Sequence, residues 1–407
     1  MRQRIKEICD YVSRGSTPDY VDSSPYKVMN QATFSKGFLD ESNVRFTSKP
    51  VIGAHIKRGD LLMASTGGGV LGKLFYYDST DDGFFADSHV SILRNSKGEN
   101  HMKYLYYYFY NRYDEINSTM VKGSTNQTEL QRDYLLSYEI EIPSFDMQHR
   151  IVDYLDAKLS EIDKRVSVLE KQRDAYMRLK KSMIHQVVTR GLNPDVPLKD
   201  SEVEWIGMIP ERWEVKRIKD LFPKYTTGLT PESKVEENFS DDGRYTWITI
   251  GDMTNKVVNE SFMCLSDKVI KEKTPVLSPK GSLLFSFKLS IGKTAFAGKD
   301  LYTNEAIVTI PPNNKYELKY FYYLIPYICL NNATENIYGA KMLNQRIIAN
   351  MLLAIPPLQE QQAIASYLDD KCAKIDAAIE NIGKQIDASK RLKRAIINEA
   401  ISGKTIL

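Results

Sequence analysis

The chain carries the same tail segment twice, and this duplication constrains its fold more than any other feature. Residues 142–186 align without a gap on residues 355–399, at an offset of 213 and with 18 identities in 45 positions. The shared residues include Tyr-Leu-Asp, Lys-Gln-x-Asp-Ala and Arg-Leu-Lys. At the same offset, "IKEICDYVSRGSTP" (5–18) aligns with "IKDLFPKYTTGLTP" (218–231). The chain is therefore one plan used twice, in the order variable block, tail, variable block, tail.

Each tail predicts a long helix with a narrow apolar seam. Apolar positions recur at alternating steps of four and three residues, which is typical of a coiled coil. We expect the two helices to pack against each other in antiparallel orientation. Two unrelated surface helices, each packed on its own block, are the alternative. The residues expected in the seam are Leu155, Ile162, Val166, Leu169, Tyr176, Met183, Leu368, Ile375, Ile379, Ile382, Ile386 and Ile396.

The variable blocks are predicted to be mixed α/β. Short apolar runs such as 60–65, 282–287 and 306–310 are bounded by Gly, Asp and Ser, as strands are. The tyrosine-rich segments 101–113 and 317–330 predict helices whose aromatic rings pack in the core.

The fold class that follows is α+β with a pseudo-twofold internal repeat, in which two mixed α/β blocks are separated by two long helices that form an antiparallel coiled coil. The predicted boundaries are 1–143 for the first block, 144–190 for the first spacer helix, 191–212 for a linker, 213–356 for the second block and 357–403 for the second spacer helix.

Composition limits the class of protein. No stretch approaches the length of an apolar membrane span, and the start "MRQRIKEICD" has no secretory pattern. The four cysteines stand far apart in the sequence, and so do the five histidines. We therefore expect a cytoplasmic protein without a metal site or a membrane partner. The net charge of +3 is small for a protein that binds nucleic acid tightly on its own.

Three enzyme readings of the sequence are weak. "STGGGVLGKL" (65–74) has the glycine and lysine spacing of a phosphate-binding loop, but Leu74 stands where Ser or Thr holds magnesium. The counterpart "SFKLSIGKT" (286–294) has Phe287 in place of the first glycine. An adenine methyltransferase needs an Asn/Asp-Pro-Pro-aromatic loop, and none occurs. Asp220 with Glu232 and Lys234 matches a nuclease pattern that is common by chance.

The whole chain resembles the specificity (S) subunit of a type I restriction-modification system. The resemblance rests on the duplicated Ile-Pro-x-x-x-x-Gln-x-x-Ile-x-x-Tyr-Leu-Asp tails and on the linker "GLNPDVPLKDSEVEWIGMIPERWEVKRIK". Gly-x-Thr-Pro near the front of each block and the Leu-Leu-x-x-Ser…Gly-Lys segments add to it. One departure is that "WIGMIPERWEV" (205–215) introduces the second block, whereas the first begins at Met1, equivalent to Glu214, without it.

The resemblance implies a non-catalytic subunit that reads DNA. Each block would be a target recognition domain for one half of a split, asymmetric site on double-stranded DNA, and the helices would set the gap. Two methyltransferase (modification) subunits would dock on it, and restriction/translocase subunits would join them. The chain would bind no cofactor, while its partners would supply S-adenosylmethionine, ATP and magnesium.

Two stretches in each block have the residue types that contact DNA. Lysines and small polar side chains hold phosphates, while Asn, Gln, Lys and Arg read base edges. A turn of small residues and a Gly-led polar segment supply them in both blocks. A coiled-coil adaptor with protein-binding end domains, the alternative function, would not need them twice. The candidates for DNA contact are Ser65, Thr66, Lys73, Lys122, Ser124, Thr125, Asn126, Gln127, Lys288, Ser290, Lys293, Tyr338, Lys341 and Asn344. The segments 30–38 and 251–259 are weaker candidates.

Overall fold

The computed structural model describes residues 2–67, 69–98, 100–122, 128–335 and 341–404. The chain divides into two compact units, one of Met1–Lys171 with Gly383–Leu407 and one of Gln172–Ile382. Each unit thus contains one variable block, part of the long helix that follows it and part of the other long helix. Because the long helices α6 (Phe145–Arg190) and α11 (Leu358–Ile401) cross the boundary between the units, the units differ from the blocks that the sequence suggests.

The first unit is built on two four-stranded sheets, in the orders β2-β9-β6-β7 and β3-β5-β4-β8. Its strands are β1 (Arg2–Arg4), β2 (Tyr11–Arg14), β3 (Tyr20–Val21), β4 (Lys27–Met29), β5 (Arg45–Thr47), β6 (Leu61–Ala64), β7 (Leu74–Tyr76), β8 (Phe84–Ala86), β9 (Val90–Arg94), β10 (Val121–Lys122), β11 (Glu129–Leu130) and β12 (Glu139–Glu141). Its shorter helices are α1 (Ile5–Ile8), α2 (Gln31–Phe34), α3 (Met102–Tyr110), α4 (Tyr113–Thr119) and α5 (Arg132–Ser137), with a 3-10 turn at Glu41–Asn43.

The second unit repeats this plan around a five-stranded sheet in the order β16-β24-β21-β22-β19. Its strands are β13 (Leu198–Asp200), β14 (Met208–Pro210), β15 (Glu214–Arg217), β16 (Thr226–Thr227), β17 (Phe239–Ser240), β18 (Trp247–Ile248), β19 (Val257–Val258), β20 (Cys264–Leu265), β21 (Leu283–Ser286), β22 (Thr294–Ala297), β23 (Tyr302–Thr303), β24 (Ile307–Ile310), β25 (Thr334–Glu335), β26 (Lys341–Met342) and β27 (Leu352–Ile355). Its shorter helices are α7 (Ile218–Leu221), α8 (Asp267–Lys273), α9 (Leu318–Asn332) and α10 (Gln345–Asn350), with a 3-10 turn at Glu236–Asn238.

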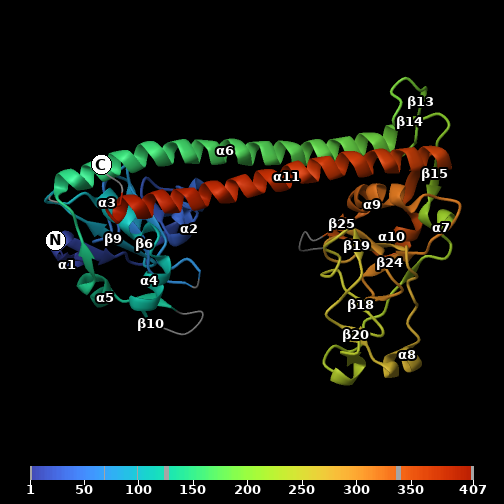
Figure 1. Cartoon of the computed structure of the whole chain (residues 1–407), viewed down its shortest axis with the longest axis horizontal. Helices are drawn as coiled ribbons and strands as arrows, with labels where there is room; N and C mark the ends of the chain where they lie inside the picture. The colour runs from blue at the N-terminus through green and yellow to red at the C-terminus, as the bar shows by residue number, and fades with distance from the viewer. Residues whose placement is uncertain (1, 68, 99, 123–127, 336–340, 405–407) are drawn as a thin grey trace. The chain divides into compact units, whose positions relative to one another are not determined.

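Within each unit the two long-helix segments lie side by side and run in opposite directions (Figure 1). In the first unit the Nζ of Lys393 lies 2.7 Å from the Oδ1 of Asp163, and in the second the Nζ of Lys180 lies 2.6 Å from the Oδ2 of Asp376. The two ion pairs are the same pair of positions at the offset of 213. The predicted fold class, with its antiparallel helices and pseudo-twofold repeat, is confirmed by this arrangement.

The seam expected from the heptads is buried or partly buried at eleven of its twelve positions. Five of its residues are buried, namely Leu155, Leu169, Leu368, Ile382 and Ile386, and six are partly buried, namely Ile162, Val166, Met183, Ile375, Ile379 and Ile396. The expectation for Tyr176 is wrong, because 38% of this residue is exposed. It lines an open recess of about 530 Å³ beside Ala175 and Ala378, whose small side chains leave the space unfilled. The seam also misses Ile397, which is 1% exposed in the core of the first unit.

A buried glutamine in each tail fixes the block to its helix. In the first unit Gln148 accepts a hydrogen bond from the backbone N–H of His101 at 2.8 Å and donates to the carbonyl of Pro143 at 3.0 Å. In the second unit Gln361 accepts from the N–H of Glu317 at 2.9 Å and donates to the carbonyl of Pro356 at 2.8 Å. Both amides thereby satisfy backbone groups where the tyrosine-rich helix begins, which explains why this glutamine recurs in both copies.

The aspartate of each Tyr-Leu-Asp motif anchors the tyrosine-rich helix. Tyr107 donates a hydrogen bond to Asp156 at 2.5 Å in the first unit, and Tyr323 donates to Asp369 at 2.6 Å in the second. Burial alone would raise the pKa of Asp369, but hydrogen bonds from Lys256 and Tyr323 hold that pKa below its usual value. Tyr104, Tyr107, Tyr320 and Tyr323 are buried core residues, as predicted, and the other tyrosines of α3 and α9 are partly buried.

The segment expected to be a linker folds into a hairpin of β13 and β14. Ile209 and Trp213 are fully buried in the core of the second unit. The indole N–H of Trp213 donates to Glu360 at 3.1 Å, and Arg212 pairs with the same carboxylate at 2.9 Å. This segment thus packs against the start of α11 and contributes Ile209 to the core of the second unit.

Candidate nucleic-acid interface

The glycine-rich segment 65–72 is a turn between two antiparallel strands. It joins β6 to β7, and the N–H of Ala64 donates to the carbonyl of Lys73 at 2.9 Å. A second backbone bond runs the other way, because the N–H of Gly72 donates to the carbonyl of Ala64 at 2.8 Å. A phosphate-binding loop runs from a strand into a helix, whose N-terminus holds the anion. The strand that follows here rules out that geometry.

The second unit forms the same turn between β21 and β22. The N–H of Ser286 donates to the carbonyl of Lys293, and the N–H of Gly292 donates to the carbonyl of Ser286, both at 2.9 Å. Ser286 therefore matches Ala64 in space, whereas the sequence alignment places it on Ser65. The turn of the second unit is two residues shorter, which accounts for this shift by one position.

A second turn lies directly beside each hairpin turn. In the first unit the side chain of Asp87 accepts a hydrogen bond from the N–H of His89 at 2.8 Å, and the N–H of Ser65 donates to the carbonyl of His89 at 2.8 Å. In the second unit Asn304 accepts from the N–H of Ala306 at 3.1 Å, and Phe287 donates to the carbonyl of Ala306 at 3.0 Å. The two units thus hold two turns together at the same end of the sheet with the same bonds.

The glycine of each Gly-x-Thr-Pro motif lets a third segment cross this place closely. A Cβ atom on Gly15 would lie 2.2 Å from the carbonyl oxygens of Ala86 and Asp87. A Cβ atom on Gly228 would lie 1.8 Å from the carbonyl oxygen of Thr303. Since no side chain tolerates such distances, only glycine fits at either position. The motif therefore brings the segment after β2 or β16 against the second turn.

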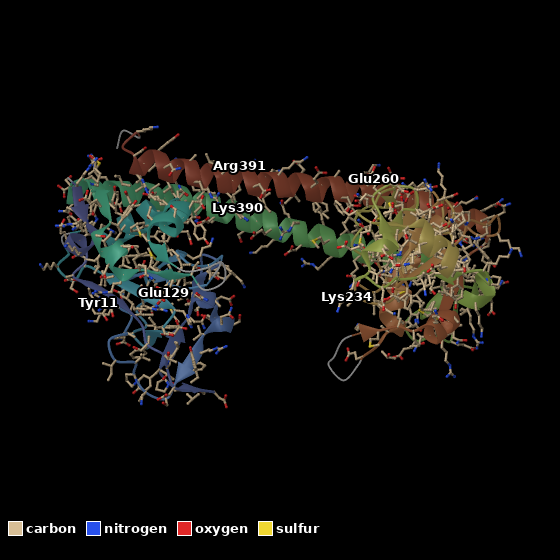
Figure 2. The ribbon with its side chains drawn as sticks, turned by 90° about the horizontal axis from the view of Figure 1, so that it is seen from below. Tyr11, Glu129, Lys234, Glu260, Lys390 and Arg391 are labelled. Atoms are coloured by element: carbon tan, nitrogen blue, oxygen red, sulfur yellow. The ribbon has the colours of Figure 1, made fainter. Side chains whose placement is uncertain are left out.

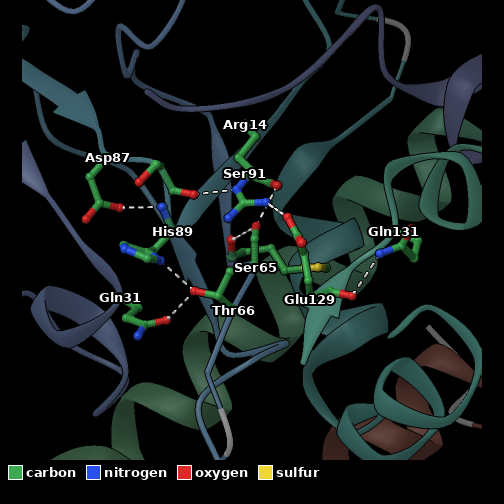
Figure 3. A network of polar contacts seen from close by, with 11 residues as sticks. Arg14, Gln31, Ser65, Thr66, Asp87, His89, Ser91, Glu129 and Gln131 are labelled. Carbon is green, nitrogen blue, oxygen red and sulfur yellow. Dashed lines mark hydrogen bonds and ion pairs between the residues drawn. The ribbon is translucent and has the colours of Figure 1, made fainter. Parts of the chain in front are cut away.

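In the first unit these turns gather polar side chains into one network (Figure 3). The hydroxyl of Thr66 lies 2.7 Å from the Nδ1 of His89 and 3.5 Å from the Oε1 of Gln31. Arg14 donates to the carbonyl of Ser88 and forms an ion pair with Glu129. The guanidinium and the amide are side chains of the types that read guanine and adenine.

Asp87 gives this network a buried carboxylate. Asp87 is 2% exposed, and desolvation raises the pKa of its carboxyl group above the usual value. The bond from the N–H of His89 and the charges of His89, Arg14 and Arg45 oppose that rise without cancelling it. Asn304 makes the same turn in the second unit without a charge.

In the second unit the corresponding network is smaller. Glu305 accepts a hydrogen bond from Thr230, and the Nζ of Lys288 lies 3.7 Å from its Oε1. Gln345 donates to the hydroxyl of Thr227 at 3.2 Å. The two units therefore place different side chains on the same arrangement of turns.

The structure corrects the expectation for two candidates. Ser65 is fully buried, and its hydroxyl lies 2.6 Å from that of Ser91, because the residue continues the buried face of β6. The Nζ of Lys293 donates to the carbonyl of Ile250 at 2.9 Å and is half-buried, so its charge is used within the fold. Ser65 is therefore not available to a DNA backbone, whereas Lys293 is partly exposed and is held by its bond to Ile250.

The other described candidates are exposed or partly exposed. Lys73 lies with its Nζ 4.9 Å from the centre of the Tyr113 ring and lines a recess of about 430 Å³ with Arg394. Asn344 caps α10 by accepting a hydrogen bond from the N–H of Ile347 at 2.9 Å. Lys341 and Ser290 are exposed.

Some of the sequence candidates lie outside the described residues. These are Ser124, Thr125, Asn126, Gln127 and Tyr338, together with the side chain of Lys122.

Arg14, His89 and Glu129 were not predicted from the sequence, and the segment of Gln31 was a weaker candidate. Arg14 directly precedes the motif glycine, and this position was the available signal. Glu129 is exposed and is labelled on the first unit in Figure 2, while Lys234, which is also exposed, is labelled on the second unit. Lys234 was part of the nuclease pattern. Among the residues that the structure describes, no group of three or more His, Cys, Asp or Glu side chains is placed to hold a metal ion.

A model of the type I restriction modification DNA specificity domain matches residues 2–170 and 210–387. The chain belongs to this family. The matched regions cover both variable blocks and the first part of each long helix.

Several members of the specificity family align with the chain. It is 30% identical to the type I restriction enzyme MjaIX specificity subunit of Methanocaldococcus jannaschii, over 46% of the chain and 43% of that subunit. It is 22% identical to the putative MjaX specificity subunit of the same organism, over 99% of the chain and 92% of that protein. The chain thus spans less than half of the first relative and nearly all of the second.

Two solved structures show the same fold. A chain from a study of complex assembly and conformational transition of the type I R-M system matches with a TM-score of 0.73 at 15% identity, over 98% of this chain and 97% of that one. The HsdS subunit from Thermoanaerobacter tengcongensis matches with a TM-score of 0.50 at 15% identity, over 100% and 97%. In the part of the specificity chain that the model describes, no helix is long and apolar enough to cross a membrane.

Proposed function

We propose that the chain is the DNA specificity subunit of a type I restriction-modification complex, and that each block reads one half of a split, asymmetric site on double-stranded DNA. One observation carries this proposal. Two units place the same three segments at the same sheet end with the same backbone bonds, yet present different side chains there. A fixed frame with variable polar groups is what two readers of different sequences require.

The side chains that would contact DNA follow from exposure and partners. Arg14, Gln31, Thr66 and His89 are the readers proposed for the first block, with Lys73 on a phosphate. Lys288, Ser290, Lys341 and Asn344 are those proposed for the second. The ion pair between Arg14 and Glu129 holds the guanidinium in one orientation, which lowers the entropy lost on binding a base.

The chain itself is proposed to catalyse nothing and to bind no cofactor. Two methyltransferase subunits would dock on it and supply S-adenosylmethionine, and restriction/translocase subunits would supply ATP hydrolysis, magnesium and cleavage. The net charge of +3 supports this division, because a nearly neutral chain gains affinity for DNA when partner subunits add phosphate contacts.

Genome-wide methylation mapping tests the proposal. A host that expresses the chain with the methyltransferase subunits of its own type I system should acquire adenine methylation at one bipartite, asymmetric motif, and omission of the chain should abolish it. The same methylation without the chain would contradict the proposal. ATP hydrolysis or DNA cleavage by the purified single chain would contradict it as well.

A further inference from the structure

The turn between β21 and β22 carries an exposed apolar side chain at its tip. Leu289 is 81% exposed, although it lies between the polar residues Lys288 and Ser290. A single exposed leucine is common on protein surfaces and means little alone. The backbone and the surroundings of this one give it a more specific meaning.

The backbone at the tip is unfavourable for residues with a side chain. Leu289 has a φ of +43° and Ser290 a φ of +38°, in the left-handed region where a Cβ atom crowds the next carbonyl. The matching turn of the first unit meets the same demand with Gly67 at +89° and Gly69 at +82°. The second block therefore keeps a large apolar side chain at a place where glycine is the more stable choice. Strain that a fold retains in this way often marks a functional residue.

Hydrogen bonds from Ser286 and Lys293 also hold the turn in place. The hydroxyl of the buried Ser286 donates to the carbonyl of Ser290 at 2.5 Å and accepts a hydrogen bond from the N–H of Lys293 at 3.1 Å. The Nζ of Lys293 donates to the carbonyl of Ile250. Leu289 is thus presented by an ordered turn, which reduces the entropy that it would lose on binding.

The groups around Leu289 belong to the proposed DNA interface. Its neighbour Lys288 lies 3.7 Å from Glu305, and Glu305 accepts a hydrogen bond from Thr230 of the motif that crosses there. An apolar side chain among such polar groups gains little binding free energy from contact with a polar protein surface. It gains from a groove of DNA, because the major groove presents one apolar group, the 5-methyl of thymine, among its hydrogen-bonding edges.

We propose that Leu289 reads a thymine methyl group in the half-site of the second block, while the glycine turn of the first block makes no such contact. The inference rests on the proposed function. The turn between β21 and β22 exposes Leu289 at the end of the sheet, and the major groove is where the thymine methyl group is exposed. The half-site of the second block therefore contains an A·T pair whose specification depends on Leu289.

Leu289→Gly tests this inference in the complex with the methyltransferase subunits. Methylation mapping should show discrimination at one A·T pair of one half-site reduced about tenfold or more, with the other half-site and the gap unchanged. The melting temperature should stay the same or rise by about 3 °C, because glycine relieves the left-handed strain. Leu289→Asn, which also tolerates this backbone, should give the same methylation result.

Leu277→Gly is the matched control, since Leu277 is exposed but lies at the opposite end of β21, next to the bridge of Ser278 with Leu301. Its motif should equal that of the wild type. If the wild-type complex yields no bipartite motif, the proposed function fails. If the wild type yields one and both Leu289 variants keep it intact, this inference is wrong and the proposed function stands.

Deoxyuridine identifies the contacted group. In a duplex that carries the mapped motif, replacing the thymine in question by deoxyuridine should weaken binding of the wild-type complex and leave that of the Leu289→Gly complex unchanged. Equal weakening of both complexes would overturn the thymine contact.

Discussion

The turns at the interface and the anchors of the long helices behave differently between the two units. At the anchors, the same side chains recur in both copies, as Gln148 and Gln361 do with the same partners. At the turns only the backbone bonds recur. Asp87 of the first unit corresponds to Asn304 of the second, and the glycines at the tip of the first turn correspond to Leu289 in the second. The duplicated chain has therefore kept the frame and changed the surface that the frame carries.

This difference separates two kinds of residue. Frame residues should affect the stability of both units alike when they are replaced, because their contacts are the same. Surface residues should affect one half-site alone.

The crossing glycines should give the largest losses of stability. Gly228→Ala places a methyl group 1.8 Å from the carbonyl oxygen of Thr303, and Gly15→Ala places one 2.2 Å from two carbonyl oxygens. We expect each to lower the free energy of unfolding by about 3 kcal/mol or more, because backbone must move. Chemical unfolding measures this. Gly251→Ala, where the nearest atom is 3.4 Å away, should cost less than about 1 kcal/mol, and an equal loss there would refute the crossing argument.

Replacement of the buried glutamines should come next. Gln361→Leu leaves the N–H of Glu317 and the carbonyl of Pro356 without their partner, at a cost of about 2 to 4 kcal/mol. Gln148→Leu should cost a similar amount in the first unit. Hydrogen exchange of each unit measures the effect locally. Gln362→Leu, at an exposed position of the same helix, serves as the control. Unequal losses of 2 kcal/mol or more between the two units would break the equivalence of the frame.

Asp87→Asn should remove the cost of a buried charge and raise the stability at pH 7 by on the order of 1 kcal/mol. Because the pKa of Asp87 is raised in the fold, its contribution is fully present below the unfolded pKa and falls as pH rises through the folded pKa. In the Asp87→Asn variant this decrease of stability with rising pH should be absent. In the second unit, Asn304→Asp should introduce such a decrease. Unfolding between pH 3 and pH 8 follows both. A lower stability of Asp87→Asn at pH 7 would mean that Arg14 and Arg45 outweigh the desolvation.

The ion pairs between the long helices should give the smallest effects. The pairs Lys180–Asp376 and Lys393–Asp163 have partly exposed side chains, so each contributes about 0.5 kcal/mol at low salt. Lys180→Asp should lose at least this amount, and the addition of Asp376→Lys should restore it. A double exchange that restores nothing in either unit would show that the pairs do not set the helix register.

Sequence alone predicted the frame well because the frame is periodic or repeated. The offset of 213 and the heptads predicted the paired helices, and the tyrosine-rich segments were correctly placed in the core. The prediction that Tyr176 is buried in the seam was wrong, because the heptad pattern does not show that Ala175 and Ala378 leave a recess beside it.

The interface was harder to predict, because exposure and hydrogen-bond partners depend on the fold. Ser65 and Lys293 have the right residue types for DNA contact, but one faces the core and the other is bonded to a carbonyl. Arg14 comes from a strand far in sequence from Glu129, so nothing local pointed to their pairing. The prediction of a linker over 191–212 did not include the burial of Ile209, which depends on the core of the second unit.

Exchange of one block tests the central claim most directly. The chain would carry, in place of residues 1–141, the equivalent block of another specificity subunit with a known half-site, and methylation would be mapped in the complex. We predict that one half-site changes to that of the donor while the other half-site and the gap stay as in the wild type. Changes in both half-sites, or in neither, would contradict the claim that each block reads its own half of the site.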